Sequence, residues 1–244
     1  MAHIKKLFQR LIEWVTASTL RKWVIASTIS WMFAAIFGAI CRDLAWHNLN
    51  INVGLSMAIT TVAVLVFGAV STSLSQSEIL RSATDEVSGW GKMSIKGWGV
   101  GTLVGVLVFV ISLLLLAVTI ATLMPGSDEA SSWARPLAFA ILAVPVAAAL
   151  AWVGIIYFVG KFQSRILDQL TQQNSHWVKT SLKGATVGLF VVLSAMLILR
   201  TRGSSIGVLG ILGAIYGMIT GAITGTRLTS LLSLEAEKEE VANT

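Results

Sequence analysis

The stretch WGKMSIKGWGVG (residues 90–101) returns 87 residues later as WVKTSLKGATVG (residues 177–188). When residues 77–101 are aligned with residues 164–188 without a gap, 12 of the 25 columns are identical. Chance agreement would give roughly two identical columns, so the segment is an internal duplication. The shared pattern is S-x-I-L-x3-T-x3-S-x-W-x-K-x-S-[IL]-K-G-x3-G, and each copy leads into an apolar run.

The composition of the chain is that of a protein embedded in lipid. Of its 244 residues, 55% are hydrophobic and 12% are charged, and the mean hydropathy is +0.78. A soluble domain carries about 25% charged residues, whereas a transmembrane helix needs about 20 mainly apolar residues. Six apolar runs of suitable length occur at residues 23–40, 51–70, 99–124, 137–160, 184–199 and 206–225. The sequence therefore predicts an all-α integral membrane protein with six transmembrane helices.

Basic residues between the apolar runs predict the orientation in the membrane. If the chain crosses at each run, fourteen Lys and Arg residues fall on the side of the termini and four on the other side. Because short cytoplasmic loops carry the excess of Lys and Arg, both termini are expected in the cytoplasm, at a bacterial inner or internal membrane. The same asymmetry accounts for the net charge of +6. It indicates the lipid bilayer and its anionic headgroups as partners, and no nucleic acid.

Each copy of the duplicated segment is interpreted as a cytoplasmic amphipathic helix that precedes two membrane spans. In the first copy Ile79, Leu80 and Ala83 stand at helical spacing, and Trp is a residue that anchors such helices at the headgroups. A third copy is inferred at the N-terminus, where residues 4–15 carry an apolar stripe that includes Trp14 near its end. The predicted interfacial anchors are Trp14, Trp90, Lys92, Lys96, Trp177, Lys179 and Lys183.

The three copies divide the chain into units that each contain one interfacial helix and a two-helix hairpin. The units lie at about residues 3–70, 77–160 and 164–226. Together they are expected to form one polytopic membrane domain, residues 1–228, followed by an acidic cytoplasmic tail at residues 229–244. Because two crossings return the chain to the same side, all units have one orientation, and their pseudo-symmetry axis is expected along the membrane normal.

Glycine recurs every three or four residues along the last apolar run, as in a glycine zipper. At 100° per residue these glycines share one sector of the helix surface, and small residues there allow a second helix to approach closely. The partner is either another helix of the same chain, such as the glycine-containing third span, or the same helix in a second copy, where the face lines a seam or a pore. The predicted helix-packing or pore faces are Gly207, Gly210, Gly213, Gly217, Gly221 and Gly225, and Gly97, Gly101 and Gly105.

Chemistry-bearing motifs are missing from the sequence. It has no phosphate-binding loop, no His-x3-His pair and no Gly-x-Ser-x-Gly, and no apolar run contains a charged residue or a histidine. The single Cys41 cannot form an internal disulfide. The sequence thus predicts no catalytic, cofactor-binding or metal-binding residues, and no enzyme.

Two classes of function remain, of which the sequence favours the first, and the second is the alternative. A structural or accessory subunit, in a homo-oligomer or a larger membrane complex, is favoured by the glycine faces and the uncharged spans. An oligomeric channel or transporter for ions or small neutral solutes is favoured by the internal repeat and by a glycine face that a pore would use. The absence of intramembrane charge counts against a path for ions.

Overall fold

The structure, a computed structural model, describes residues 18–47, 53–83, 89–123, 143–171, 176–198 and 205–242. Every element in these ranges is a helix and none is a strand. The helices are α2 (Thr19–His47), α3 (Val53–Arg81), α4 (Trp90–Leu123), α6 (Val144–Thr171), α7 (Trp177–Ile198) and α8 (Ile206–Ala242). Each is long and apolar enough to cross a membrane. The prediction of an all-α, multi-pass membrane protein with six spans is confirmed at this level.

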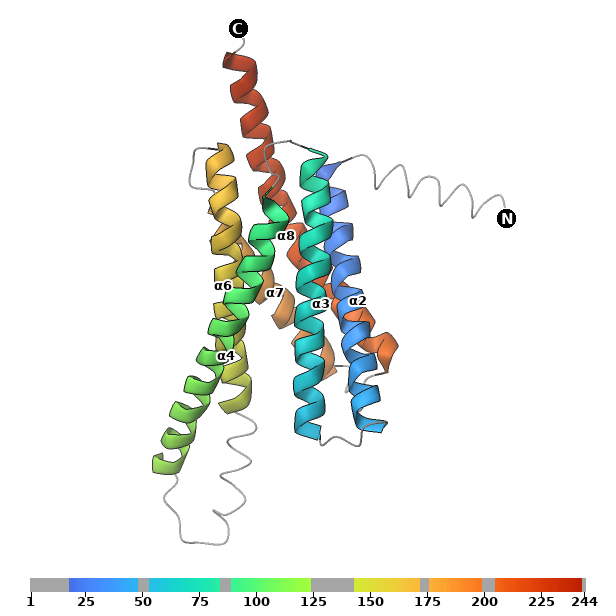
Figure 1. Ribbon diagram of the computed structural model, residues 1–244, viewed down its shortest axis with the longest axis vertical. Coiled ribbons are helices and arrows are strands. Elements are labelled where there is room, and N and C mark those ends of the chain that lie inside the picture. Colours follow the sequence, from blue (N-terminus) through green and yellow to red (C-terminus); the bar gives the residue numbers. More distant parts are fainter. Residues whose placement is uncertain are drawn as a thin grey trace, which may run out of the picture.

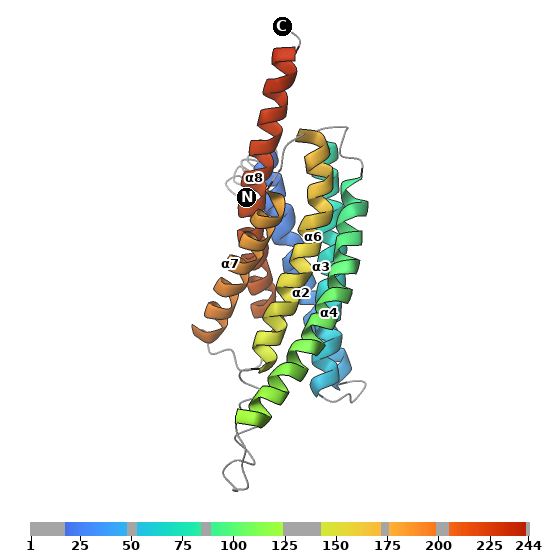
Figure 2. The same cartoon turned by 90° about the vertical axis from the view of Figure 1, so that its left-hand side faces the viewer.

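The six helices form three antiparallel hairpins, α2–α3, α4–α6 and α7–α8, which are arranged in a ring. Each helix packs against the one before it and the one after it, and α8 closes the ring by packing against α2. The helices α2, α4 and α7 begin at the upper end of the bundle in Figure 1, and α3, α6 and α8 run up to or past that end. Figure 2 shows the same arrangement from the side. The first helices of the three hairpins therefore enter the bundle from one end.

The duplicated segment forms no separate helix within the described residues. Helix α3 continues unbroken through the first half of the first copy to Arg81, and α4 begins with the second half at Trp90. The second copy is divided in the same way between the end of α6 and the start of α7. This differs from the predicted helices along the headgroups, because the apolar residues Leu80 and Leu167 are buried inside the bundle. The predicted N-terminal amphipathic helix, with Trp14, lies outside the described residues.

The glycine face of α8 packs against α2 of the same chain. A Cβ atom at Gly213 would collide with the Trp31 carbonyl oxygen, and one at Gly217 would collide with the Ser27 carbonyl oxygen. A Cβ atom at Gly221 would lie 2.9 Å from Ser27 Cβ. Small residues thus allow the two backbones to meet, as expected for close packing in a membrane. In this structure α2 fills the face that a second copy would need.

The two ends of this glycine row differ from each other. Gly210 lies against Ile36, and Gly225 lies against Leu20, so both still face α2. Gly207, at the start of α8, is exposed and has only its own neighbour Ser205 within 4 Å of its Cβ position. The contact between α8 and α2 therefore begins one turn into α8.

The glycine row of α4 meets α6 and does not meet α8. A Cβ atom at Gly97 would lie 2.9 Å from Val159 Cα, and one at Gly101 would lie 2.7 Å from the Ile155 carbonyl oxygen. Gly105 also faces the Ile155 side chain. The two glycine rows hence serve different contacts, one within the hairpin α4–α6 and one that joins the last hairpin to the first.

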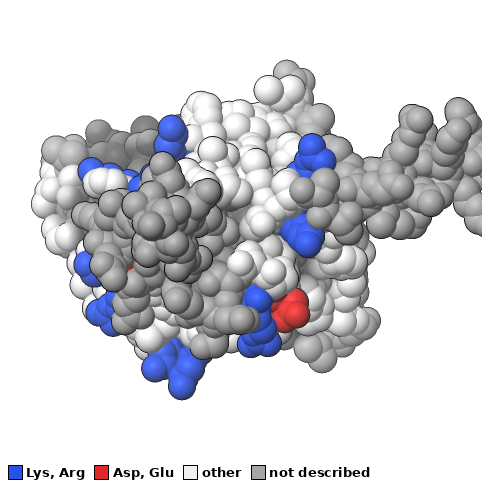
Figure 3. All heavy atoms as spheres, turned by 90° about the horizontal axis from the view of Figure 1, so that it is seen from above, with Lys and Arg blue, Asp and Glu red and all other residues white. Residues whose placement is uncertain are grey.

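Lysines surround the end at which α2, α4 and α7 begin. Lys92 and Lys96 on α4 and Lys179 and Lys183 on α7 are exposed. Figure 3 views this end of the molecule and shows Lys and Arg side chains spread around it. Cations at the ends of apolar helices are placed where lipid headgroups lie.

Candidate functional site

Three tryptophans meet on the axis of the ring, at the end where α2, α4 and α7 begin. Trp23, Trp90 and Trp177 come one from each of these helices, and each is at most 1% exposed. Their ring centroids are 5.8, 6.2 and 5.6 Å apart, with interplanar angles of 65°, 84° and 80°. Edge-to-face geometry of this kind favours aromatic pairs. One tryptophan per hairpin at nearly equal spacing gives the three hairpins an approximate threefold arrangement. We call these residues the tryptophan layer.

Three leucines complete the tryptophan layer from the second helix of each hairpin. Leu80, Leu167 and Leu228 are each at most 1% exposed and belong to the same core cluster as the tryptophans. The duplicated segment supplies the first two, whereas Leu228 comes from α8, beyond any copy that the alignment detects. The third hairpin therefore supplies the same residue types at this level as the other two.

One helical turn further into the bundle, the side chains on the axis become polar. In each hairpin the first helix carries a serine four residues after the tryptophan, and the second helix carries a polar residue four residues before the leucine. These residues are Ser27, Ser94 and Ser181, and Gln76, Gln163 and Thr224. An unpaired polar group costs about 1–3 kcal/mol in the interior, so the hydrogen bonds at this level matter. We call it the polar layer.

Within two hairpins the glutamine of the polar layer is bonded to the serine. Gln76 Nε2 donates to Ser27 Oγ at 3.3 Å, and Gln163 Nε2 donates to Ser94 Oγ at 2.9 Å. In the third hairpin Ser181 Oγ is buried and makes no hydrogen bond within the described residues. Threonine is shorter than glutamine, so Thr224 does not provide the partner that the serine has in the other hairpins.

Hydrogen bonds also join neighbouring hairpins of the ring. The tryptophan of one hairpin donates to the Gln or Thr of the polar layer in the hairpin before it, and the first hairpin follows the third around the ring. Trp177 Nε1 donates to Gln163 Oε1 at 2.8 Å, and Trp23 Nε1 donates to Thr224 Oγ1 at 3.0 Å. At the third seam, between α3 and α4, Trp90 Nε1 makes no hydrogen bond within the described residues. The approximate threefold symmetry is thus broken at this seam.

A second aromatic layer lies below the polar layer, and it too is asymmetric. Trp31 and Trp98 stand eight residues after Trp23 and Trp90, but the corresponding residue of α7 is Ala185. The Trp31 ring centroid is 6.0 Å from that of Trp98 and 4.9 Å from that of Tyr216 on α8. The Trp152 ring of α6 contacts Trp31, Trp98 and Tyr216, so the third tryptophan of this layer comes from α6 and not from α7.

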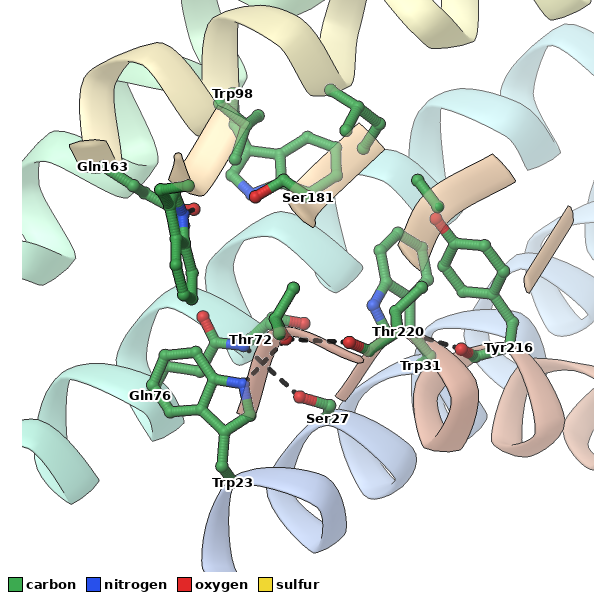
Figure 4. Close-up of a pocket in the computed structure, with 15 residues that line it drawn as sticks. Trp23, Ser27, Trp31, Thr72, Gln76, Trp98, Gln163, Ser181, Tyr216 and Thr220 are labelled. Atoms are coloured by element: carbon green, nitrogen blue, oxygen red, sulfur yellow. Dashed lines mark hydrogen bonds between the residues drawn. The ribbon is translucent and has the colours of Figure 1, made fainter. Parts of the chain in front are cut away.

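A cavity of about 70 Å³ is bounded by residues of these layers. All six helices contribute to its wall, and no residue of the wall is charged. Figure 4 shows indole rings and the labelled hydroxyl and amide groups around it. The polar residues of the wall are Ser27, Thr72, Gln76, Gln163, Ser181, Thr220 and Thr224. Such a wall can form hydrogen bonds to an uncharged molecule, but it contains no group suited to acid–base or nucleophilic catalysis at neutral pH. We call this space the axial cavity.

The tryptophans, lysines and glycines that the sequence predicted as site residues lie in different parts of the structure. Trp90 and Trp177, predicted to face the headgroups, have their rings buried against protein, because the three indoles pack on one another. The lysines of both copies are exposed at the same end. Apart from the exposed Gly207, the predicted glycines line contacts between helices, and none of them lines the axial cavity.

Sequence reasoning missed Trp23 as the third member of the repeat. Trp14 was predicted instead, from the apolar stripe nearby and from Ser18 four residues later, and the same pattern W-x3-S also occurs at Trp23, Trp90 and Trp177. The predicted duplication begins at Ser77 and Ser164, one residue after the identical pair Gln76 and Gln163. The sequence therefore already contained the glutamine pair of the polar layer.

Comparison with protein-family models, with curated proteins and with solved structures finds no match to the chain. Within the part of the chain that the structure describes, no three His, Cys, Asp or Glu side chains come together in a group that would hold a metal ion. The function is therefore argued from the axial cavity and its surroundings.

Proposed function

We propose that this multi-pass membrane protein is a channel or transporter, without enzymatic activity, whose solute path follows the axis of the helix ring. The observation that carries the proposal is the axial cavity, to which all six helices contribute. Transporters built from repeats place their solute site between the repeats, in the middle of the bundle. A cavity shared by three related hairpins fits that plan.

The arrangement of the layers supports a closed state of such a path. The tryptophan layer lies on one side of the polar layer, and Trp31, Trp98 and Tyr216 lie on the other. Aromatic constrictions of this kind exclude water from a pore and close it. Passage of a solute requires the tryptophan layer to separate, and the seam between α3 and α4, where Trp90 lacks the hydrogen bond of its counterparts, is the weakest place for that movement.

Ala185 offers a direct test of the path. It is 4% exposed, lines the axial cavity and occupies the position that holds tryptophan in the other two hairpins. We expect Ala185→Leu, which adds three carbons, to fill the cavity and to reduce solute flux into proteoliposomes, measured by light scattering after an osmotic step, to the level of protein-free liposomes. The matched control is Val187→Leu on the exposed face of the same helix, which is expected to leave the flux unchanged. Equal flux in the unchanged protein and Ala185→Leu would contradict the proposal.

An accessory subunit remains the second candidate, and α4 carries the observation that favours it. The span within α4 is only 6% buried inside the protein. Its exposed residues include Leu103, Leu107, Leu114 and Leu115. An apolar surface of this extent takes either lipid or the helix of another membrane protein. Co-purification from native membranes, with and without Leu107→Trp, tests this candidate, because a bulky substitution at a protein contact would release the partner.

A further inference from the structure

We infer that the axial cavity selects small uncharged molecules that both donate and accept hydrogen bonds, such as short amides. This inference rests on the proposed function and names the solute class of the same site. Three properties of the cavity carry it: the absence of charge in its wall, its two unpaired hydroxyl groups, and its size.

The wall of the cavity offers an ion no charge of opposite sign. No Asp, Glu, Lys, Arg or His lines it, and a charge moved into a low-dielectric interior without a partner carries a penalty of several kcal/mol. Aromatic faces can bind cations, but the face or edge of Trp31 is already in contact with Trp98, Trp152 and Tyr216, at centroid distances of 6.0, 6.1 and 4.9 Å. The rings pack on one another and do not form an open aromatic cage.

Two buried hydroxyl groups of the wall have no hydrogen-bond partner among the described residues. Thr72 Oγ1 and Ser181 Oγ belong to residues that are each 8% exposed, and neither atom makes a hydrogen bond within the described residues. Thr72 lies on α3 and Ser181 on α7, two helices that are three places apart in the ring of six and so lie on opposite sides of it, and both residues line the cavity. Figure 4 shows both residues in the wall of the cavity.

These hydroxyl groups define the chemistry of the ligand. Each offers one donor and two acceptor positions. By contrast, both polar ends of Gln163 are already used, by Ser94 and by Trp177. A molecule that bridges Thr72 and Ser181 therefore binds best when it carries both a donor and an acceptor, as an amide does.

The volume limits the size of the ligand. A cavity of about 150 Å³ holds benzene, with its six carbons. The axial cavity, at about 70 Å³, therefore suits about three non-hydrogen atoms by the same ratio. Acetamide, with one atom more, is close to this size, and acetate and acetamidinium have the same shape with a negative and a positive charge.

These three molecules are the probes for the test. Saturation-transfer NMR on the purified full chain in detergent micelles reports contact through the methyl group that all three share. We expect binding of acetamide, and none of acetate or acetamidinium. Thr72→Val, which keeps the shape and removes the hydroxyl, and Ser181→Ala are each expected to weaken acetamide binding about five- to tenfold, since each removes one hydrogen bond to the ligand. Ser71→Ala is the control, because Ser71 Oγ bonds to its own helix at the Phe67 carbonyl oxygen.

The results separate this inference from the proposed function. Binding of either ion at the level of acetamide, no binding of acetamide, or unchanged binding in both Thr72→Val and Ser181→Ala would overturn the inference. Flux of acetamide into proteoliposomes is then measured with the same variants. If acetamide binds but crosses no faster than through protein-free liposomes, the inference stands and the proposed transport function fails.

Discussion

The contact between α8 and α2 closes the helix ring, and Gly217 tests it. A Cβ atom at Gly217 would lie 2.8 Å from the carbonyl carbon of Ser27 and 2.8 Å from Thr28 Cα, and it would collide with the Ser27 carbonyl oxygen. All three atoms belong to the backbone of α2, so no side-chain rotation relieves the overlap. We expect Gly217→Ala to push the two helices apart.

The magnitude follows from two opposing effects. Extra atoms in a well-packed interior cost about 1–3 kcal/mol, while replacement of glycine by alanine in a helix stabilises it by about 0.5–1 kcal/mol. Gly99→Ala on α4 isolates the stabilisation of the helix by alanine, since no described residue contributes an atom within 4 Å of the Cβ position there. We expect Gly99→Ala to be neutral or slightly stabilising. Gly217→Ala is expected to unfold more easily than Gly99→Ala by about 1–3 kcal/mol, the overpacking cost alone.

The free energy of unfolding is measured by titrating denaturing detergent into mild-detergent micelles and following tryptophan fluorescence. The chain has nine tryptophans, of which three form the tryptophan layer. A separated layer therefore changes the signal. If Gly217→Ala and Gly99→Ala unfold at the same detergent fraction, the close approach of α8 to α2 is refuted.

Three further predictions concern the tryptophan layer and the orientation. Trp177→Phe is expected to cost about 1–3 kcal/mol more than Trp90→Phe in the same titration, because only Trp177 leaves a buried acceptor without its donor; equal costs would contradict the hydrogen-bond pattern. Leu167→Ala is expected to cost about 2–5 kcal/mol as a fully buried leucine, whereas the half-exposed Leu193→Ala is expected to cost much less; a similar loss in both would argue against the layer. Cys41 lies near the end of α2 that is far from the tryptophan layer, so an impermeant maleimide is expected to label it from outside intact cells; labelling only after permeabilisation would reverse the predicted orientation.

The number and approximate place of the spans followed from hydropathy, because a run of about 20 apolar residues satisfies the bilayer wherever its neighbours lie. Residues 206–225 illustrate this, since α8 begins at Ile206 as the sequence indicates. The helices extend further at the tryptophan end than the apolar runs do, as α4 shows by beginning at Trp90. Lysines on these first turns lower the hydropathy of a window, but they reach outward and leave the buried side of the helix apolar.

The sequence by itself determined the six spans, the glycine rows and the duplication, because each is a local pattern. Only the tertiary structure decided which helix fills a glycine row, and which tryptophans meet. Trp23 and Thr224 are 201 residues apart and share a hydrogen bond, and no local spacing predicts that pair. The wall of the axial cavity comes from six helices at once, and Ala185 is part of it. Such a site arises from the shapes that distant segments leave between them, which are set by packing after the helices have formed.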